Sequence, residues 1–144
     1  MDQTLPSQID LRVVTPDRQV VHNLVKAVSI PGENGYLGIL PGHAPLLTEL
    51  MAGELAYTEG ARAHHLAIAW GFAEVLPGRV IVLAETAERA EDIDTERAQR
   101  AKQRAEDRLK KPDPEIDTER ARAALERALA RLQVAARAHG SPVP

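Results

Sequence analysis

Short runs of alternating apolar and polar residues fill the chain up to about residue 85. In the first run Ile9, Leu11 and Val13 alternate with Asp10 and Arg12. Similar runs follow at residues 19–21, 25–30, 54–57, 65–68, 72–76 and 79–83, separated by turn residues such as Pro16-Asp17, Pro31-Gly32, Glu59-Gly60 and Pro77-Gly78. Short strands between such turns are typical of an antiparallel sandwich or barrel.

Beyond residue 91 the apolar residues recur with the period of a helix. One series is Ala98, Ala101 and Ala105, and a second is Ala121, Leu125, Ala128, Leu132 and Ala135. Their spacings of three and four place each series on one helical face. Between them, the segment 111–114 (Lys-Pro-Asp-Pro) breaks the helix, because proline lacks a backbone N–H and disfavours helix in the residue before it.

These two patterns predict an α+β fold. We expect an N-terminal antiparallel β-sandwich over residues 1–90, a C-terminal antiparallel two-helix hairpin over 91–137 and a flexible tail over 138–144. The alanine-rich seam buries little apolar area. At about 25 cal/mol per Å² the hairpin is therefore marginal on its own and needs the sandwich, a partner or a ligand.

Composition narrows the class of protein. A length of 144 residues allows one or two small domains, and a hydrophobic content of 44% is enough for a compact core. Only 3% of the residues are aromatic, so the core must be aliphatic. A net charge of −3 gives no indication of nucleic-acid binding, and the absence of cysteine excludes a disulfide or a thiolate nucleophile. The N-terminal residues lack a signal-peptide pattern, and no apolar run approaches the ~20 residues of a membrane span. Any membrane association is expected to run through another protein.

One hexapeptide occurs twice: residues 93–98 and 116–121 both read Ile-Asp-Thr-Glu-Arg-Ala. Each copy suits a helix start, because an Asp accepts hydrogen bonds from free backbone N–H groups and a Glu in the first turn faces the positive end of the helix dipole. Duplication or a shared function is the alternative explanation.

The sequence offers no persuasive catalytic or metal-binding group. His64 and His65 are adjacent in a predicted strand, so they point to opposite faces and cannot hold one metal together. Ser29 and Ser141 have no His-Asp arrangement that sequence can justify. We therefore predict that the chain is not an enzyme on its own and requires no cofactor.

The segment 35–47 (Gly-Tyr-Leu-Gly-Ile-Leu-Pro-Gly-His-Ala-Pro-Leu-Leu) is a turn-rich corner without the Lys-Ser/Thr of a phosphate loop. It closely resembles the signature of the epsilon subunit of bacterial F-type ATP synthase. The blocks 70–75, 80–85 and 87–94 resemble that family's strand-turn-strand block and its hinge into the helices. The resemblance runs roughly from Ile9 to Ala136. Tyr36 and Trp70 depart from it, standing where the family often has an acidic residue and a glycine.

The resemblance implies a non-catalytic subunit of the rotating central stalk, peripheral on the cytoplasmic face of the cell membrane. Its partners would be the gamma subunit, the ring of c subunits and the alpha and beta catalytic subunits. It would couple proton flow to ATP synthesis and inhibit ATP hydrolysis through mobile helices. His43, at the tip of the corner, is either a turn histidine or a contact with the c-ring. An unrelated sandwich adaptor with a coiled-coil tail is the alternative.

The resemblance also implies ATP as a regulatory ligand. Some epsilon subunits bind ATP through Ile/Leu-Asp-x-x-Arg-Ala, which residues 93–98 match. The candidate residues are Glu88, Asp94, Arg97, Arg104, Arg127 and Arg131. The arginines are seven and four residues apart within their helices, so a folded hairpin can bring four guanidinium groups around a triphosphate, with the carboxylates accepting from ribose or adenine. The alternative is that these charged residues form ordinary solvent-exposed helix surface and bind no ligand.

Overall fold

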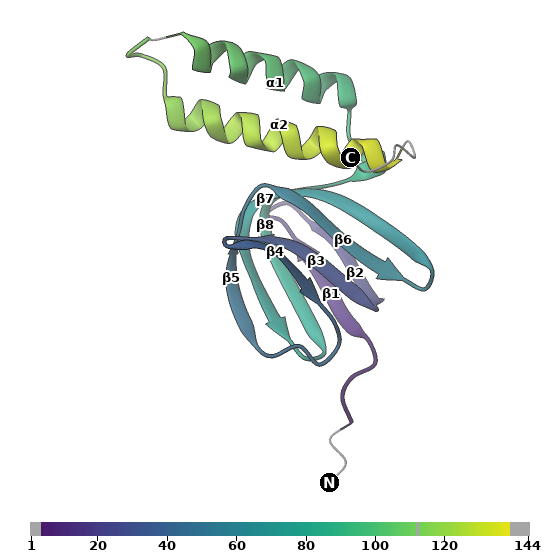
Figure 1. The fold of residues 1–144 in the computed structure, drawn as a ribbon. Coiled ribbons are helices and arrows are strands. Elements are labelled where there is room, and N and C mark those ends of the chain that lie inside the picture. The colour runs from purple at the N-terminus through teal and green to yellow at the C-terminus, as the bar shows by residue number, and fades with distance from the viewer. Residues whose placement is uncertain (1–3, 112, 139–144) are drawn as a thin grey trace.

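A computed structural model describes residues 4–111 and 113–138 of the chain (Figure 1). Within them, strands precede helices, which confirms the predicted α+β class. The strands are β1 (Ile9–Val14), β2 (Gln19–Val25), β3 (Ala27–Gly32), β4 (Gly35–Ile39), β5 (Leu46–Leu50), β6 (Gly53–Glu59), β7 (Arg62–Leu76) and β8 (Arg79–Arg89). A 3-10 helix η1 (Ala90–Asp92), α1 (Thr95–Lys110) and α2 (Thr118–Ala138) follow. The predicted tail lies outside the described residues, apart from Ala138.

The strands form one sheet that folds over on itself, in the order β2-β1-β8-β7-β5-β3-β4, with β6 bridging β3 and β7. Every pair is antiparallel except β1 and β8, which run parallel. Alternate residues of the central strands, such as Leu11, Val13, Val80 and Val82, are fully buried between the layers. The core is aliphatic apart from Tyr57, as the low aromatic content required.

The long strand β7 differs from the prediction of two separate strands at 65–68 and 72–76. Its first half pairs with β6 and its second half with β5, while β8 pairs along both halves. The chain bends where φ is positive at both Trp70 (51°) and Gly71 (118°). A Cβ atom at Gly71 would lie 1.9 Å from the carbonyl oxygen of Leu83, so glycine is required there. The bend interrupts the apolar pattern without ending the strand.

The sequence predicts a hinge over residues 87–94, but most of these residues belong to regular secondary structure. Strand β8 continues to Arg89, whose guanidinium donates to the Val20 carbonyl oxygen (2.9 Å) and the Tyr57 hydroxyl (3.4 Å). The 3-10 turn η1 then leads directly into α1. The connection to the helices is therefore anchored in the sandwich core.

Both copies of the repeat begin a helix, as predicted. The Oδ1 atoms of Asp94 and Asp117 accept from the backbone N–H groups of Arg97 and Arg120, each at 3.1 Å. Helix α1 ends at Lys110, and Lys111 is extended (φ −95°, ψ 117°), as expected of a residue before proline.

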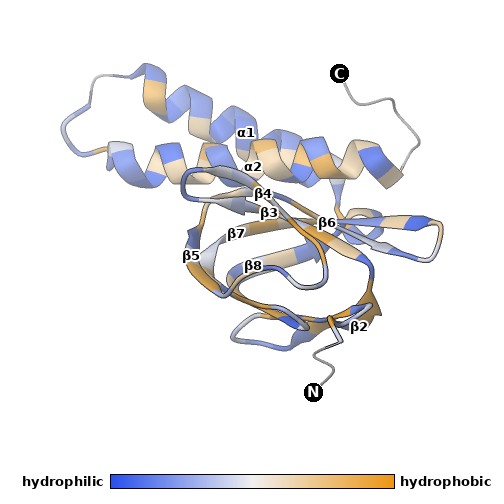
Figure 2. Ribbon diagram, turned by 60° about the horizontal axis from the view of Figure 1, so that its bottom comes forward, coloured by the Kyte–Doolittle hydropathy of each residue, from blue (hydrophilic) through white to orange (hydrophobic). Residues whose placement is uncertain are grey.

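The hairpin lies on the sandwich, with α2 between α1 and the sheet (Figure 1). Ala98 and Ala105 of α1 and Ala121 and Ala128 of α2 are buried, so this part of the predicted alanine seam lies between the helices. A second face of α2 carries buried Ala130 and Val134, and Val134 clusters with Ala135, Ala67, Ala90 and Ile93. Figure 2 shows more hydrophobic colouring along α2 than along α1. Over the described residues, neither helix is long and apolar enough to cross a membrane.

Candidate functional site

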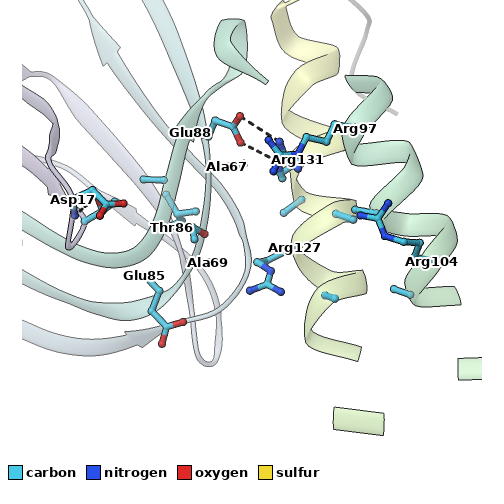
Figure 3. A pocket seen from close by; sticks show the side chains of 18 of the residues that line it. Asp17, Ala67, Ala69, Glu85, Thr86, Glu88, Arg97, Arg104, Arg127 and Arg131 are labelled. Atoms are coloured by element: carbon cyan, nitrogen blue, oxygen red, sulfur yellow. Dashed lines mark hydrogen bonds and ion pairs between the residues drawn. The ribbon is translucent and has the colours of Figure 1, made fainter. Parts of the chain in front are cut away.

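A cavity of about 710 Å³ opens between the helical hairpin and strands β7 and β8 (Figure 3). Its walls come from α1, α2, the two strands and the turn between β1 and β2. Five of the six residues predicted to bind a nucleotide line it: Glu88, Arg97, Arg104, Arg127 and Arg131. Residues up to 43 positions apart in the sequence therefore meet at one place.

Asp94, the sixth candidate, is not among the lining residues. Its carboxylate is engaged as the N-cap of α1, accepting from the backbone N–H of Arg97. Asp94 therefore positions the first turn of α1, and with it Arg97, which faces the cavity. A contact of Asp94 with a ligand stays a prediction.

Glu88 and Arg131 form a bidentate ion pair across the cavity. Arg131 Nε lies 2.9 Å from Glu88 Oε2, and Nη2 lies 3.4 Å from Oε1 (Figure 3). Both side chains are half-buried, which reduces solvent screening of the pair. This contact ties α2 to β8, and a ligand that hydrogen-bonds to Glu88 must share the carboxylate with Arg131.

The other arginines retain donors for a ligand. Within the described residues, Arg97, Arg104 and Arg127 make no side-chain hydrogen bond or ion pair. Arg127 does contact the ring of Trp70, at 5.5 Å from guanidinium carbon to ring centroid. Guanidinium groups with unused N–H edges suit a multiply charged anion, because each can donate two parallel hydrogen bonds to phosphate oxygens.

Four further charged residues that the sequence pattern did not indicate also line the cavity: Asp17, Arg18, Glu85 and Arg108. Arg108 follows Arg104 by one helical turn, so its spacing was a usable signal. The other three carried no local signal, because only the fold of the sheet brings the β1–β2 turn and the middle of β8 to the hairpin. Among the described residues, the cavity walls hold six arginines against three carboxylates, which favours an anion.

A second ion pair fastens the end of α2 to the sandwich. Arg137 Nε and Nη2 donate to Glu54 Oε2 and Oε1 at 2.9 and 3.2 Å, and the two side chains are only 18% and 11% exposed. His65 Nδ1 lies 3.5 Å from the same carboxylate. Glu54 is thus the main polar anchor of the α2 C-terminus.

Arg137→Ala is expected to loosen α2 without unfolding the sandwich. Loss of a charge-assisted pair this buried should lower the free energy of local opening by about 1.5 kcal/mol, roughly ten-fold faster amide exchange. Hydrogen exchange along α2 measures it. Arg122→Ala, on an exposed position of the same helix, serves as the control and should leave exchange unchanged. Equal effects of the two variants would contradict the anchoring role of Glu54.

His43 lies far from this cavity, in the loop between β4 and β5. Its Nδ1 is 2.7 Å from the Ala44 carbonyl oxygen, and neighbouring Gly42 donates to the Pro77 carbonyl oxygen in the β7–β8 turn. This is the end of the sandwich opposite the hairpin (Figure 1). Leu40 and Leu47 nearby are 64% and 70% exposed, so the loop presents an apolar surface.

Family models match nearly the whole chain. One, for the "ATP synthase, Delta/Epsilon chain, beta-sandwich domain", matches residues 8–90. The second, for the "ATP synthase, Delta/Epsilon chain, long alpha-helix domain", matches residues 91–136.

Individual relatives agree with these matches. The ATP synthase epsilon chain of Koribacter versatilis is 58% identical over 106 residues, covering 74% of this chain and 75% of that one. The epsilon chain of Trichlorobacter lovleyi is 48% identical over 135 residues, or 93% and 98% of the two chains. A chain in the cryo-EM structure of the Euglena gracilis mitochondrial ATP synthase OSCP/F1/c-ring is 29% identical with a TM-score of 0.78, covering 88% of this chain and 80% of that one.

Proposed function

The chain belongs to the delta/epsilon family of ATP synthase subunits, and from that premise we propose that it is a non-catalytic subunit of the rotating central stalk. In this role the sandwich binds the gamma subunit and rests against the c-ring, coupling proton flow to ATP synthesis. It associates with the cytoplasmic face of the membrane only through the complex. Family models that cover residues 8–136 argue against an unrelated sandwich adaptor.

We further propose that the cavity binds ATP as a regulatory ligand. One observation carries this proposal. Glu88 of β8 and four arginines from α1 and α2 line the same cavity, which lies between the helices and the sheet. The guanidinium edges bind the phosphates, while Glu88 and Asp94 accept from ribose or adenine. Six arginines in the cavity walls supply the positive charge that a triphosphate needs.

In this proposal ATP binds the compact conformation of the chain, in which the hairpin lies on the sheet. The cavity has walls from both the sandwich and the helices, so it exists only while the hairpin lies on the sheet. A ligand that binds one conformation shifts the population toward it by its difference in affinity. When the hairpin leaves the sandwich, its basic helices extend toward the alpha and beta subunits and inhibit hydrolysis.

Calorimetric titration of the isolated chain with ATP tests the regulatory proposal, and saturable binding is the expected result. Absence of heat and of saturation at millimolar nucleotide would exclude the site. Copurification from membranes tests the stalk assignment separately, since gamma and the catalytic subunits must accompany the chain.

The loop around His43 is expected to contact the c-ring. Its exposed leucines suit packing against another protein, and it lies at the end of the sandwich away from the hairpin. His43→Cys introduces the single cysteine of the chain, so its crosslinks are unambiguous. We expect crosslinks to the polar loop of the c subunit. Crosslinks only to catalytic subunits in every nucleotide state would show that the sandwich docks in the reverse orientation.

A further inference from the structure

Trp70 occupies a backbone conformation that a bulky side chain rarely adopts. Among the described residues it is the only non-glycine residue with positive φ (51°), and it directly precedes Gly71 at the bend of β7. Glycine takes this conformation without steric cost, whereas a residue with a Cβ is strained there. The bend by itself does not require an indole, so the side chain needs another explanation.

The contact that Trp70 makes is with the candidate site. The guanidinium carbon of Arg127 lies 5.5 Å from the centroid of the indole, within the range of a cation–π interaction. Arg127 lines the cavity, and so does Ala69, the residue before Trp70, whereas Trp70 itself does not. The Trp70 side chain therefore contacts a residue of the cavity wall, Arg127, without lining the cavity itself.

A guanidinium group uses different parts of its surface for these two interactions. Its flat face stacks on an aromatic ring, while its N–H groups point outward from the edge in a fixed fork. Arg127 is exposed and has no other side-chain partner in the described part of the chain, so without the indole its long side chain would sample many rotamers. The contact with the indole removes part of that freedom, and the N–H groups that do not face the ring stay available to phosphate oxygens.

We propose that Trp70 is a positioning residue for the nucleotide triphosphate: its indole holds the face of the Arg127 guanidinium so that the N–H edge is preset for a phosphate group. This inference rests on the proposed ATP site and adds a residue outside the motif. Preordering a donor before binding raises affinity, because less conformational freedom is lost when the ligand arrives.

Trp70→Gly separates positioning from structural support. Glycine relieves the backbone strain, so the thermal midpoint should be unchanged or higher, whereas ATP affinity should fall about three- to ten-fold. Trp70→Phe keeps a weaker π face and should recover part of the affinity. Calorimetric titration measures the affinity, and thermal unfolding without nucleotide measures the stability.

A double-mutant cycle identifies the residue through which Trp70 acts. In an Arg127→Ala background, Trp70→Gly should no longer change ATP affinity. In the matched Arg104→Ala background, which keeps the contact between Trp70 and Arg127, the same substitution should still lower affinity three- to ten-fold. Unchanged affinity of Trp70→Gly, or equal losses in both backgrounds, would overturn the positioning role while leaving the ATP site intact. Absence of ATP binding by the wild type would overturn both.

Discussion

Arg97→Ala is expected to weaken ATP binding about ten- to a hundred-fold, while Arg120→Ala leaves it unchanged. Loss of one charge-assisted phosphate contact costs about 1.5–3 kcal/mol. The two arginines hold the same position in identical hexapeptides, each donating its backbone N–H to the N-cap aspartate at 3.1 Å. Only Arg97 lines the cavity. Local sequence and helix position are therefore matched, and only tertiary placement differs.

Calorimetric titration of both variants with ATP measures the difference. Both side chains are exposed, so neither substitution should change the fold, and circular dichroism verifies that helix content is retained. Equal losses for the two variants would mean that general positive charge, rather than this cavity, holds the phosphates. Arg127→Ala should resemble Arg97→Ala, since it removes a second lining guanidinium.

Removal of the hairpin is expected to leave a folded sandwich that still binds gamma, while ATP hydrolysis by the assembled complex rises about five-fold or more. Regulatory couplings typically amount to about 1–3 kcal/mol, which corresponds to roughly 5- to 150-fold. The sandwich core is a cluster separate from the small one beneath α2. A chain ending at Glu91 therefore keeps every residue of the sandwich core, whose members all lie before that position.

Reconstitution of the complex with the truncated and the full-length chain measures this effect in one hydrolysis assay. Full-length Gln133→Ala, at an exposed and uncharged position of α2, serves as the control and should inhibit as the wild type does. A truncated chain that fails to bind gamma would contradict the proposal that the sandwich alone binds gamma while the hairpin inhibits hydrolysis. Unchanged hydrolysis with normal gamma binding would exclude the hairpin as the inhibitory element.

Local chemistry made much of this architecture predictable. The change of apolar period, the break at 111–114 and the aspartates that cap both helices involve residues no more than a few positions apart. The alanine seam was visible for the same reason, since a helical face is a property of one segment. Family resemblance, rather than pattern, singled out the residues now found around the cavity.

Tertiary structure decided what depends on distant partners. The parallel pairing of β1 with β8, the uninterrupted β7 and the second apolar face of α2 follow from packing against segments elsewhere in the chain. Glu88 meets Arg131 across 43 residues, and Asp17 joins them from a turn near the N-terminus. A sequence pattern reports backbone period and face, but a site built by chain segments far apart exists only after the sheet and hairpin pack together.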